Sequence, residues 1–351
     1  MTFVPKPAVH HPQLPVNDLG LTRRDYEGPV STLCAGCGHD SVSAAIVQAC
    51  ADLSLPPHRF AKISGIGCSS KTPSYFLEKS HGFNSVHGRM PSVATGANLA
   101  NRELHCVGIS GDGDSASIGL GQFAHIVRRR INMLYIVDNN GTYGLTKGQF
   151  SATNDKGSRN KRGLPNLYQP IDLVTMAMQI GATFVARSFS GDKTQLVPLI
   201  KAALLHKGFA FIDVISPCVA FNNHEGSTKS YEYVRANRDD VVMADLITPR
   251  REITTDYAPG TREELPMPDG SVLRLRKIDE HYDPRDRIEA IRFVQEKQQQ
   301  GEVVTGLLYI DPDSVDCHHI LNTVEQPLNS LVDKDLVPGN DALAAVNESF
   351  R

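Results

Sequence analysis

The 351-residue sequence contains no tryptophan, and aromatic residues make up only 7% of it. Aromatic platforms for stacking nucleic-acid bases are therefore not expected. Neither sign of charge dominates, because the formal net charge is only −3, so a basic nucleic-acid surface is not expected either. Apolar residues (40%) and charged residues (21%) occur in the proportions of an ordinary globular protein.

Long apolar runs are also missing. The sequence has no run of about 18 apolar residues, so no membrane span is predicted. The first residues, MTFVPKPAVHHPQLPVND, lack the apolar core of a secretory signal, which predicts a cytoplasmic protein. In that compartment the seven cysteines are expected to be thiols, metal ligands or redox groups rather than disulfides.

Three segments differ in character. Residues 1–30 are proline-rich and predict an extended arm on the core or on a neighbour, or a partly disordered terminus. Residues 31–240 predict one α/β domain. Residues 241–351 predict a C-terminal extension that packs on this core or on a partner subunit. In it we expect a hairpin within 251–280 turning at Pro268-Asp269-Gly270, a helix at 284–300, a strand at 303–310, and loop-like last forty residues with one late helix.

Strands and helices alternate within the central domain. Apolar periodicity predicts helices over 38–53, 92–102, 117–130, 171–180 and 194–206, and strands over 60–64, 104–110, 133–137, 183–187 and 209–215. Such alternation indicates an α/β fold with a doubly wound, mostly parallel sheet. Ligands bind at the carboxyl ends of the strands in these sheets. Four glycine-rich or polar segments directly follow predicted strands: Gly65–Ser70, Gly111–Asp114, Asn139–Leu145 and Ser216–Cys218.

Oxygen ligands follow two neighbouring predicted strands. Asp112 stands between Gly111 and Gly113, and Asn140 ends the next strand. Together with the backbone carbonyl of Thr142, these groups suit Mg²⁺, which also takes oxygens from a phosphorylated ligand. The helix after Asp114 would offer N–H groups to phosphate. The alternative is a pair of ordinary strand-end turns.

Four cysteines lie in glycine-rich or proline-flanked surroundings: Cys34, Cys37, Cys68 and Cys218. Such a dispersed set fits either tetrahedral zinc or a [4Fe–4S] cluster. The remaining three differ in context. Cys50 and Cys106 are expected to be packed core thiols. Cys317, in Asp-Cys-His-His, is expected in an exposed loop without a ligand role; the alternative is a metal site formed with His318 and His319.

Six motifs occur in an order that we associate with one family. CAGCGH, GIGCSS, HGR, TGANLAN, GDGD and NNGTYGLTKGQ together resemble the β subunit of 2-oxoacid:ferredoxin oxidoreductases over about residues 25–240, more weakly to about 310. The resemblance implies a thiamine-diphosphate-binding fold, Mg²⁺ held by Asp112, Asn140 and Thr142, and one [4Fe–4S] cluster held by the four cysteines. The positions it implies for contact with thiamine diphosphate are Ile66, Gly67, Cys68, Ser69, His87, Gly113, Asp114, Gly144 and Leu145.

The resemblance also implies a reaction. A 2-oxoacid and coenzyme A would give acyl-CoA and CO₂, with electrons passing to ferredoxin, and the same groups would serve CO₂ fixation in reverse. Lys71 falls near the distal end of the oxoacid, where a cation would pair with the second carboxylate of 2-oxoglutarate; pyruvate is the alternative substrate. Arg89 is expected either to bind a substrate carboxylate or to form a structural salt bridge.

Partners follow from the resemblance as well. The glutamate that activates thiamine diphosphate belongs to the α subunit in this family, so we expect the chain to be inactive alone and to form an (αβ)₂ assembly. Arg128-Arg129-Arg130 resembles a docking patch for acidic ferredoxin, although cations at a helix C-terminus also favour the helix dipole. The extension past about 310, the basic stretch Lys156–Arg162 and the N-terminal arm depart from the family pattern.

Two rival functions come from other classes. A non-redox thiamine-dependent decarboxylase would keep the GDG and NN motifs but would have no use for four cysteines. A structural or binding subunit would bind zinc through the four cysteines and would not need the GDG and NN motifs.

Overall fold

One large sheet organises the chain. The computed structural model describes residues 6, 13–160, 162–247, 262–266, 272–277 and 282–351. Within this part, ten strands form one sheet in the order β10-β11-β9-β12-β7-β8-β4-β3-β1-β2. Neighbouring strands from β7 to β2 are parallel, which confirms the predicted α/β fold with a mostly parallel sheet. These strands are β7 (Phe184–Phe189), β8 (Phe209–Ile215), β4 (Met133–Asn139), β3 (His105–Gly111), β1 (Phe60–Ser64) and β2 (His81–Asn84).

The other side of the sheet comes from the C-terminal part of the chain. It consists of β12 (Val303–Ile310), β9 (Arg238–Ile247), β10 (Arg262–Pro266) and β11 (Val272–Lys277). β12 is antiparallel to β7 and parallel to β9, while β10 and β11 form an antiparallel pair. That pair confirms the predicted hairpin, although its predicted turn at Pro268-Asp269-Gly270 lies outside the described residues.

Strand β9 was not predicted from the sequence, because its first residues are charged. The structure pairs these charges: Asp240 accepts hydrogen bonds from Thr305 at 2.5 Å and from Gln195 at 3.0 Å, and Arg238 forms a 2.6 Å ion pair with Asp192. The segment boundary predicted at residue 240 falls inside this strand, and the division into three segments stays a prediction.

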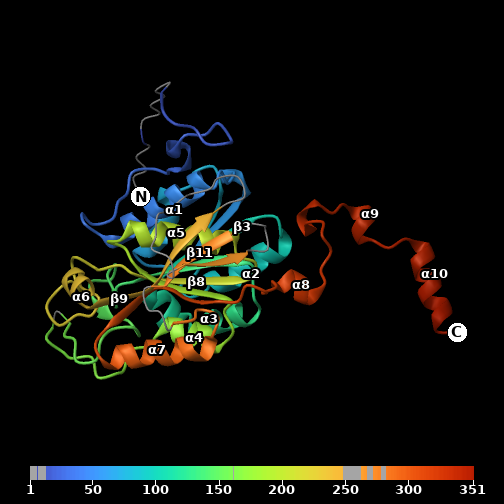
Figure 1. Ribbon diagram of the computed structural model, residues 1–351. Coiled ribbons are helices and arrows are strands. Elements are labelled where there is room, and N and C mark those ends of the chain that lie inside the picture. The colour runs from blue at the N-terminus through green and yellow to red at the C-terminus, as the bar shows by residue number, and fades with distance from the viewer. Residues whose placement is uncertain (1–5, 7–12, 161, 248–261, 267–271, 278–281) are drawn as a thin grey trace.

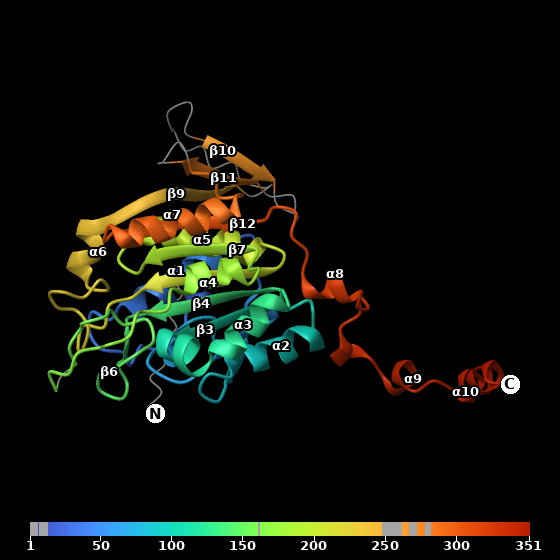
Figure 2. The ribbon, with the colours of Figure 1, turned by 90° about the horizontal axis from the view of Figure 1, so that it is seen from below.

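Helices cover both faces of the sheet. One face carries α1 (Gly38–Asp52) and α5 (Lys193–Leu205), which pack on each other. The opposite face carries α2 (Met90–Ala100), α3 (Leu120–Arg128), α4 (Leu173–Gln179) and α7 (Arg287–Gln299), as Figures 1 and 2 show. The short helix α6 (Tyr231–Asn237) and the two-stranded pair β5 (Thr142–Tyr143) and β6 (Gln149–Phe150) lie in the loops at one edge.

Local sequence sets the helix starts. Asp172, Asp192 and Asp286 cap α4, α5 and α7 by accepting backbone N–H bonds from the first turn, which the predicted boundaries anticipated to within three residues. The helix predicted over 117–130 is different. It begins as a π-helical turn (Gly113–Ile118), and α3 starts only after Gly119. Such widened turns are frequent at functional sites.

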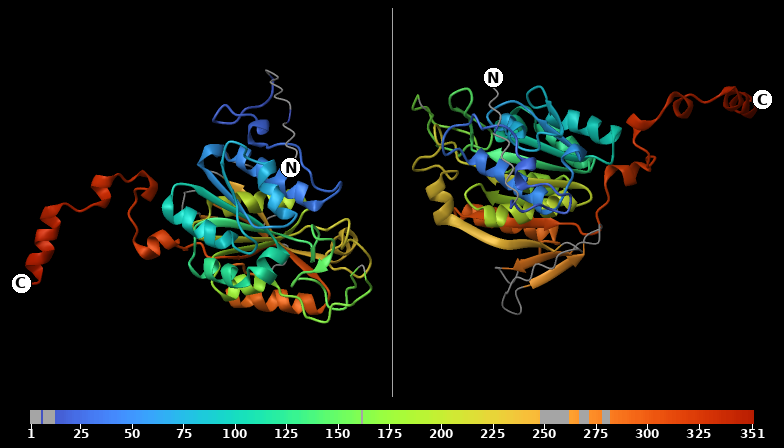
Figure 3. Two further views of the ribbon diagram at one scale, coloured as in Figure 1. Left: turned by 180° about the vertical axis from the view of Figure 1, so that it is seen from behind. Right: turned by 90° about the horizontal axis from the view of Figure 1, so that it is seen from above.

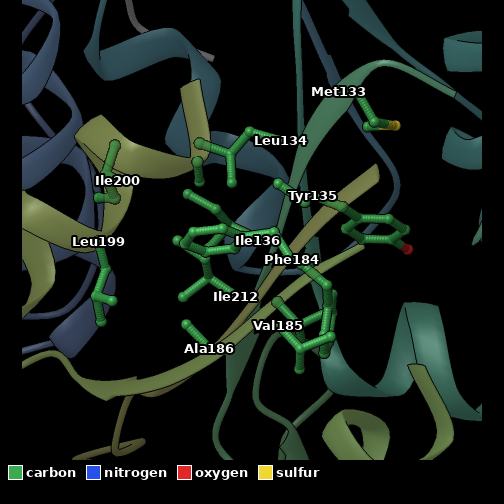
Figure 4. Packing of buried hydrophobic residues seen from close by; sticks show 14 of the residues in the cluster. Met133, Leu134, Tyr135, Ile136, Phe184, Val185, Ala186, Leu199, Ile200 and Ile212 are labelled. Carbon is green, nitrogen blue, oxygen red and sulfur yellow. The ribbon is translucent and has the colours of Figure 1, made fainter. Parts of the chain in front are cut away.

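The core forms where the central strands meet these helices. Leu134 and Ile136 of β4 lie toward Leu199 and Ile200 of α5, whereas Tyr135 points to the opposite face (Figure 4). This alternation is the two-residue period of a strand that is buried on both sides. Cys50 and Cys106 are buried among the same core residues, which confirms their prediction as packed thiols.

The two ends of the chain behave differently. In the N-terminal segment Asn17 donates to the Tyr26 hydroxyl at 2.7 Å and to the Ala51 carbonyl at 3.1 Å, so this part packs along α1. The C-terminal segment carries α8 (Cys317–Leu321), which packs on α2 through Asn98, and then leaves the body with α9 (Asp333–Leu336) and α10 (Asn340–Ser349) (Figures 2 and 3).

The C-terminal segment corrects two expectations. The last forty residues contain α8 and α9 besides the late helix, since Asp316 caps α8 through the backbone N–H of His319. Cys317 is buried, and its thiol donates to the Asn98 side chain at 3.6 Å, so the prediction of an exposed loop was wrong. Of the helices that the structure describes, none has the length and apolar character to cross a membrane.

The burial of the central strand β4 leads to a prediction about the free energy of unfolding. Replacing the buried Ile136 with alanine should lower the free energy of unfolding by about 2–5 kcal/mol, because it removes buried methyl groups and leaves a cavity. The matched change at Ile288, which is 80% exposed on α7, should cost about 0.5 kcal/mol or less. Urea titration followed by circular dichroism measures both, and equal losses would contradict the described packing.

Candidate functional site

Loops from separate strands meet at the carboxyl edge of the parallel strands. They begin at or directly after the ends of β1, β3, β4 and β8, as the sequence predicts. Three of them, with His39 and His87, enclose a cavity of about 90 Å³. Twelve of the residues predicted for the cofactor and its metal line it: Ile66, Gly67, Cys68, Ser69, His87, Asp112, Gly113, Asp114, Asn140, Thr142, Gly144 and Leu145. Cys34, Cys37, Lys71, Arg89 and Cys218 lie outside its lining.

Asp112 is a buried carboxylate with one oxygen held by hydroxyl groups. Ser151 and Thr153 both donate to Oδ2, the latter at 2.6 Å, while Oδ1 accepts only the backbone N–H of Asn140 at 3.3 Å. Burial raises the pKa of this carboxyl, although these hydrogen bonds oppose the shift. A cation at Oδ1 would favour the charged form in the same way.

Asn140 and Thr142 continue the set of oxygen donors. The Asn140 side-chain oxygen accepts the backbone N–H of Thr142 at 3.0 Å, and the Thr142 carbonyl accepts the N–H of Gly144 at 3.1 Å. The amide oxygen and the carbonyl thus lie on one turn after β4, and the carboxylate of Asp112, after β3, adjoins that turn through its hydrogen bond with the N–H of Asn140. These are hard oxygen donors of the kind that Mg²⁺ prefers.

The carboxylate of Asp114 holds the cavity wall together. Its Oδ1 accepts the N–H of Gly88 at 2.7 Å and that of Ile66 at 3.2 Å, and it also contacts Nδ1 of His87. Its Oδ2 accepts the hydroxyl of Ser110. With both oxygens engaged inside the protein, this residue can offer a ligand its backbone N–H, near the start of the π-helical turn, rather than its carboxylate.

Two features of the cavity wall suit a bound ligand: the missing side chain at Gly113 and a buried hydroxyl at Ser69 that has no hydrogen-bond partner among the described residues. A Cβ atom on Gly113 would lie 2.5 Å from the ring of Tyr143, whose hydroxyl donates to the Gly113 carbonyl at 3.0 Å. The Ser69 hydroxyl is buried at the cavity and has no hydrogen-bond partner among the described residues. Buried hydroxyls are normally paired, so this one suits a polar ligand group.

The four predicted cysteines gather beside the same cavity. Cys37 ends a turn in which its N–H donates to the Cys34 carbonyl at 3.0 Å, and it precedes α1 directly. Burial raises the pKa of the Cys37 thiol to about 12, and the nearby thiol of Cys218 adds to the rise. The pKa of Cys68 is also raised, chiefly by burial and then by Cys218 and Cys34. The thiols therefore lie within electrostatic reach of one another.

Gly144 brings two of these sulfur atoms against the cofactor cavity. A Cβ atom on Gly144 would lie 3.3 Å from the sulfur of Cys218 and 3.5 Å from that of Cys68. Both Gly144 and Cys68 also line the cavity. The two sulfur atoms therefore lie beside the Gly144 backbone, which forms part of the cavity wall.

No three His, Cys, Asp or Glu side chains of the described residues converge closely enough to hold a metal ion by themselves. The magnesium donors include one carboxylate only, so such a grouping is not required for them. For two of the four cysteines, Cys68 and Cys218, the shared position around Gly144 is the observation that suits a cluster. Their ligand role stays a prediction.

A buried pair lies behind the cysteines. His39 is 1% exposed; its Nδ1 hydrogen-bonds to the Ser216 hydroxyl at 2.7 Å and lies 3.7 Å from Oδ2 of Asp138. Burial lowers the pKa of His39 to about 4 and raises that of Asp138 well above its ordinary range. Both shifts favour the neutral form of the side chain, because burial removes each group from water.

The two predicted substrate residues lie at the edge of the site. Lys71 follows Cys68 on a short 3₁₀ helix (Ser69–Tyr75), and its charge opposes the rise that burial causes in the pKa of the Cys68 thiol. Among the described residues it has no ion-pair partner. Arg89 is exposed and donates only to the Gly88 carbonyl, at 3.3 Å, so the structural salt bridge considered for it is absent from the described part.

Several residues of the site were not foreseen from the sequence. Ser151 and Thr153 lie eleven or more positions beyond Asn140 and carry no motif of their own. Tyr143 lies within the predicted segment but without a predicted role. Isolated polar residues in a loop show no periodic pattern in the sequence, so only the folded structure reveals that Ser151, Thr153 and Tyr143 contact the site.

A second cavity, of about 620 Å³, lies behind Asn139 and Thr153. Its cations are already paired with carboxylates: Arg187 with Asp172 and Asp213, and Lys229 with Asp155. The smaller cavity contains the Ser69 hydroxyl, unpaired among the described residues, and an Asp112 whose Oδ1 accepts only one backbone N–H. It is therefore the better site for a charged cofactor.

Known proteins resemble the chain in sequence. The family described as thiamine pyrophosphate enzyme, C-terminal TPP binding domain, matches residues 65–214. The 2-oxoacid:ferredoxin oxidoreductase subunit beta of Saccharolobus solfataricus is 41% identical over 199 residues, which are 56% of this chain and 65% of that protein. The 2-oxoglutarate synthase subunit KorB of Methanocaldococcus jannaschii is 39% identical over 189 residues, 54% of this chain and 69% of that protein.

A solved structure resembles the fold. The 2-oxoglutarate:ferredoxin oxidoreductase from Magnetococcus marinus, with 2-oxoglutarate, coenzyme A and succinyl-CoA bound, superposes with a TM-score of 0.72 at 29% identity, covering 93% of this chain and 96% of that one. The chain spans a little under two thirds of the length of the Saccharolobus relative and a little over two thirds of the KorB subunit. On these similarities the chain belongs to the β-subunit family of the 2-oxoacid:ferredoxin oxidoreductases.

Proposed function

We propose that this chain is the subunit that holds thiamine diphosphate, Mg²⁺ and one [4Fe–4S] cluster in a 2-oxoacid:ferredoxin oxidoreductase acting on 2-oxoglutarate. The reaction converts 2-oxoglutarate, coenzyme A and two oxidised ferredoxins into succinyl-CoA, CO₂, a proton and two reduced ferredoxins. The supporting observation is that Cys68 both lines the cofactor cavity and shares the contact around Gly144 with Cys218.

Each bound group would supply one part of the chemistry. Thiamine diphosphate supplies a carbon nucleophile and an electron sink for decarboxylation. An iron–sulfur cluster accepts electrons singly. The protein's part is to hold these groups next to each other. Asp112, Asn140 and Thr142 would anchor the diphosphate through Mg²⁺, Ser69 and the N–H groups of the π-helical turn would receive its oxygens, and the four cysteines would hold the cluster.

The substrate assignment depends on Lys71. Its charge lies next to Cys68, at the side of the site where the cysteines gather. A cation without an ion-pair partner in the described part suits a second carboxylate, which 2-oxoglutarate carries and pyruvate lacks. The bound 2-oxoglutarate in the Magnetococcus structure is in line with this choice.

A partner subunit completes the site in this proposal. The cavity of about 90 Å³ is small beside the few hundred Å³ of ordinary ligand pockets, and its lining contains no glutamate. Exposed apolar side chains surround it: Ile66, Val86, Ile118 and Leu145 are 38–74% exposed. Such a rim suits burial against another protein. We therefore propose that an α subunit covers this edge and brings the activating glutamate, in an (αβ)₂ assembly within the cytoplasm.

The role of Lys71 has a direct test. With the purified complex under anaerobic conditions, 2-oxoglutarate should be used far better than pyruvate. Lys71→Ala should lower kcat/KM for 2-oxoglutarate by about 10- to 100-fold, because a charge-assisted hydrogen bond contributes about 1.5–3 kcal/mol, and should leave pyruvate turnover unchanged. Lys79→Ala, an exposed lysine nearby, is the control. A preference for pyruvate in the unchanged enzyme would contradict the assignment.

The hydrogen bond from Thr153 to the carboxylate of Asp112 gives a second prediction. Thr153→Val removes a hydroxyl that donates to this carboxylate and keeps the side-chain shape. The Mg²⁺ concentration needed for half-maximal binding of thiamine diphosphate should rise about tenfold or more. Calorimetric titration of the complex measures it, with Thr194→Val, at an exposed threonine of α5, as control. An unchanged Mg²⁺ requirement would show that the hydroxyl does not position the carboxylate.

The cysteines give a third prediction. The complex purified anaerobically should contain about four iron atoms per β chain, and Cys68→Ala should lose most of this iron. Cys50→Ala, at a buried core thiol outside the site, should retain it. Metal and sulfide analysis decides the matter. Zinc in place of iron would favour the structural zinc alternative and refute the redox role.

A further inference from the structure

One stretch of the chain has a charge composition unlike the rest. Residues 156–171 contain four cations, Lys156, Arg159, Lys161 and Arg162, and no aspartate or glutamate, although the whole chain has a net charge of −3. The proposed catalytic roles leave this stretch unused. We call residues 156–168 the basic finger.

The basic finger has a defined backbone. Residues 159 and 165 form an antiparallel bridge, and the N–H of Gly157 donates to the Asn166 carbonyl at 2.7 Å. The buried side chain of Asn166 donates to the carbonyls of Asn154 at 2.9 Å and Asp155 at 3.2 Å. The finger is therefore fixed at its base and not an extended loop.

Its surface combines cations with exposed apolar side chains. Leu164, Leu167 and Tyr168 are 59%, 72% and 79% exposed. Lys156, Arg159 and Arg162 are exposed as well, and none of them forms an ion pair with the described residues; Arg159 donates to the Gly163 carbonyl at 2.7 Å. Arginine and tyrosine are enriched at protein interfaces, so this surface suits an acidic protein partner.

The finger is anchored on the loops that carry the site. Asn154 at its base donates to the Gly141 carbonyl at 2.8 Å, in the turn of the predicted magnesium ligands. Asn222 donates to the neighbouring Asn140 carbonyl at 2.7 Å, and its own N–H donates to the Cys218 carbonyl at 3.0 Å. The finger and the Cys218 loop are thus both hydrogen-bonded to the turn of Asn140 and Gly141 at the carboxyl edge of the sheet.

The other basic patch considered for this role lies elsewhere. Arg128 ends α3, and Arg129 and Arg130 follow it on the way to the first residue of β4, at the amino edge of the sheet. Arg130 there accepts the N–H of Cys317. A strand of seven residues separates the two edges, which is roughly 20 Å at 3.3 Å per residue. A carrier docked at these arginines would be far from the thiols.

We propose that the basic finger is the docking surface for the acidic electron carrier that receives electrons from the cysteine site. The inference rests on the proposed function and adds the carrier's position to it. The apolar rim around the cofactor cavity suits a permanent subunit, whereas a cationic surface speeds a transient encounter with an anionic partner. The carrier takes one electron at each encounter and leaves reduced.

Charge reversal tests the inference on the intact complex. Arg159→Glu with Arg162→Glu should raise the KM for ferredoxin at least tenfold at low ionic strength and weaken its salt dependence. Reduction of methyl viologen, a small cationic acceptor, should stay within twofold in the same preparation. Arg128→Glu with Arg129→Glu is the matched control and should change neither activity.

Three results would overturn the inference. The finger variant could keep its KM for ferredoxin, the control variant could raise it instead, or the finger variant could separate from the partner subunit in gel filtration, which would make the finger a subunit contact. If the unchanged complex reduces methyl viologen with 2-oxoglutarate and coenzyme A, such a result concerns the finger alone. If it does not, the proposed function itself fails and the inference with it.

Discussion

The buried carboxylate of Asp114 is the contact on which the site depends most. It joins the loop after β1, through Ile66, to the loop after β2, through His87 and Gly88, and ties both to the end of β3. Gly65 lies so close that a Cβ atom there would overlap Oδ2 of this carboxylate. Without these bonds the backbone N–H groups of the two loops would be unpaired, and the cavity wall would lose its shape.

A second constraint links the cofactor cavity to the thiols. Gly144 follows the predicted magnesium ligands, and its missing side chain faces the sulfur atoms of Cys68 and Cys218. A Cβ atom at this position would be in tight contact with the sulfur of Cys218. The proposed transfer of electrons depends on this closeness, since a cluster next to the cofactor can accept electrons without an intermediate carrier.

The sequence predicted the fold and the place of the site because both depend on patterns along the chain. Apolar runs located five of the six strands of the parallel half but not β2 (His81–Asn84), whose residues are exposed, and glycines and polar residues at strand ends located the cavity. It did not predict β9, whose charged residue Asp240 accepts hydrogen bonds from the distant residues Thr305 and Gln195. Nor did it predict Ser151 and Thr153, because a loop hydroxyl acquires its role only when the fold brings it to Asp112.

The central claim is that this chain holds thiamine diphosphate and an iron–sulfur cluster in direct succession. Electron paramagnetic resonance of the anaerobic complex, mixed with 2-oxoglutarate in the presence or absence of thiamine diphosphate, tests it most directly. The account predicts that the signal of a reduced cluster develops only when substrate and cofactor are both present. A cluster signal that ignores thiamine diphosphate, or the absence of any cluster signal after reduction with dithionite, would contradict it.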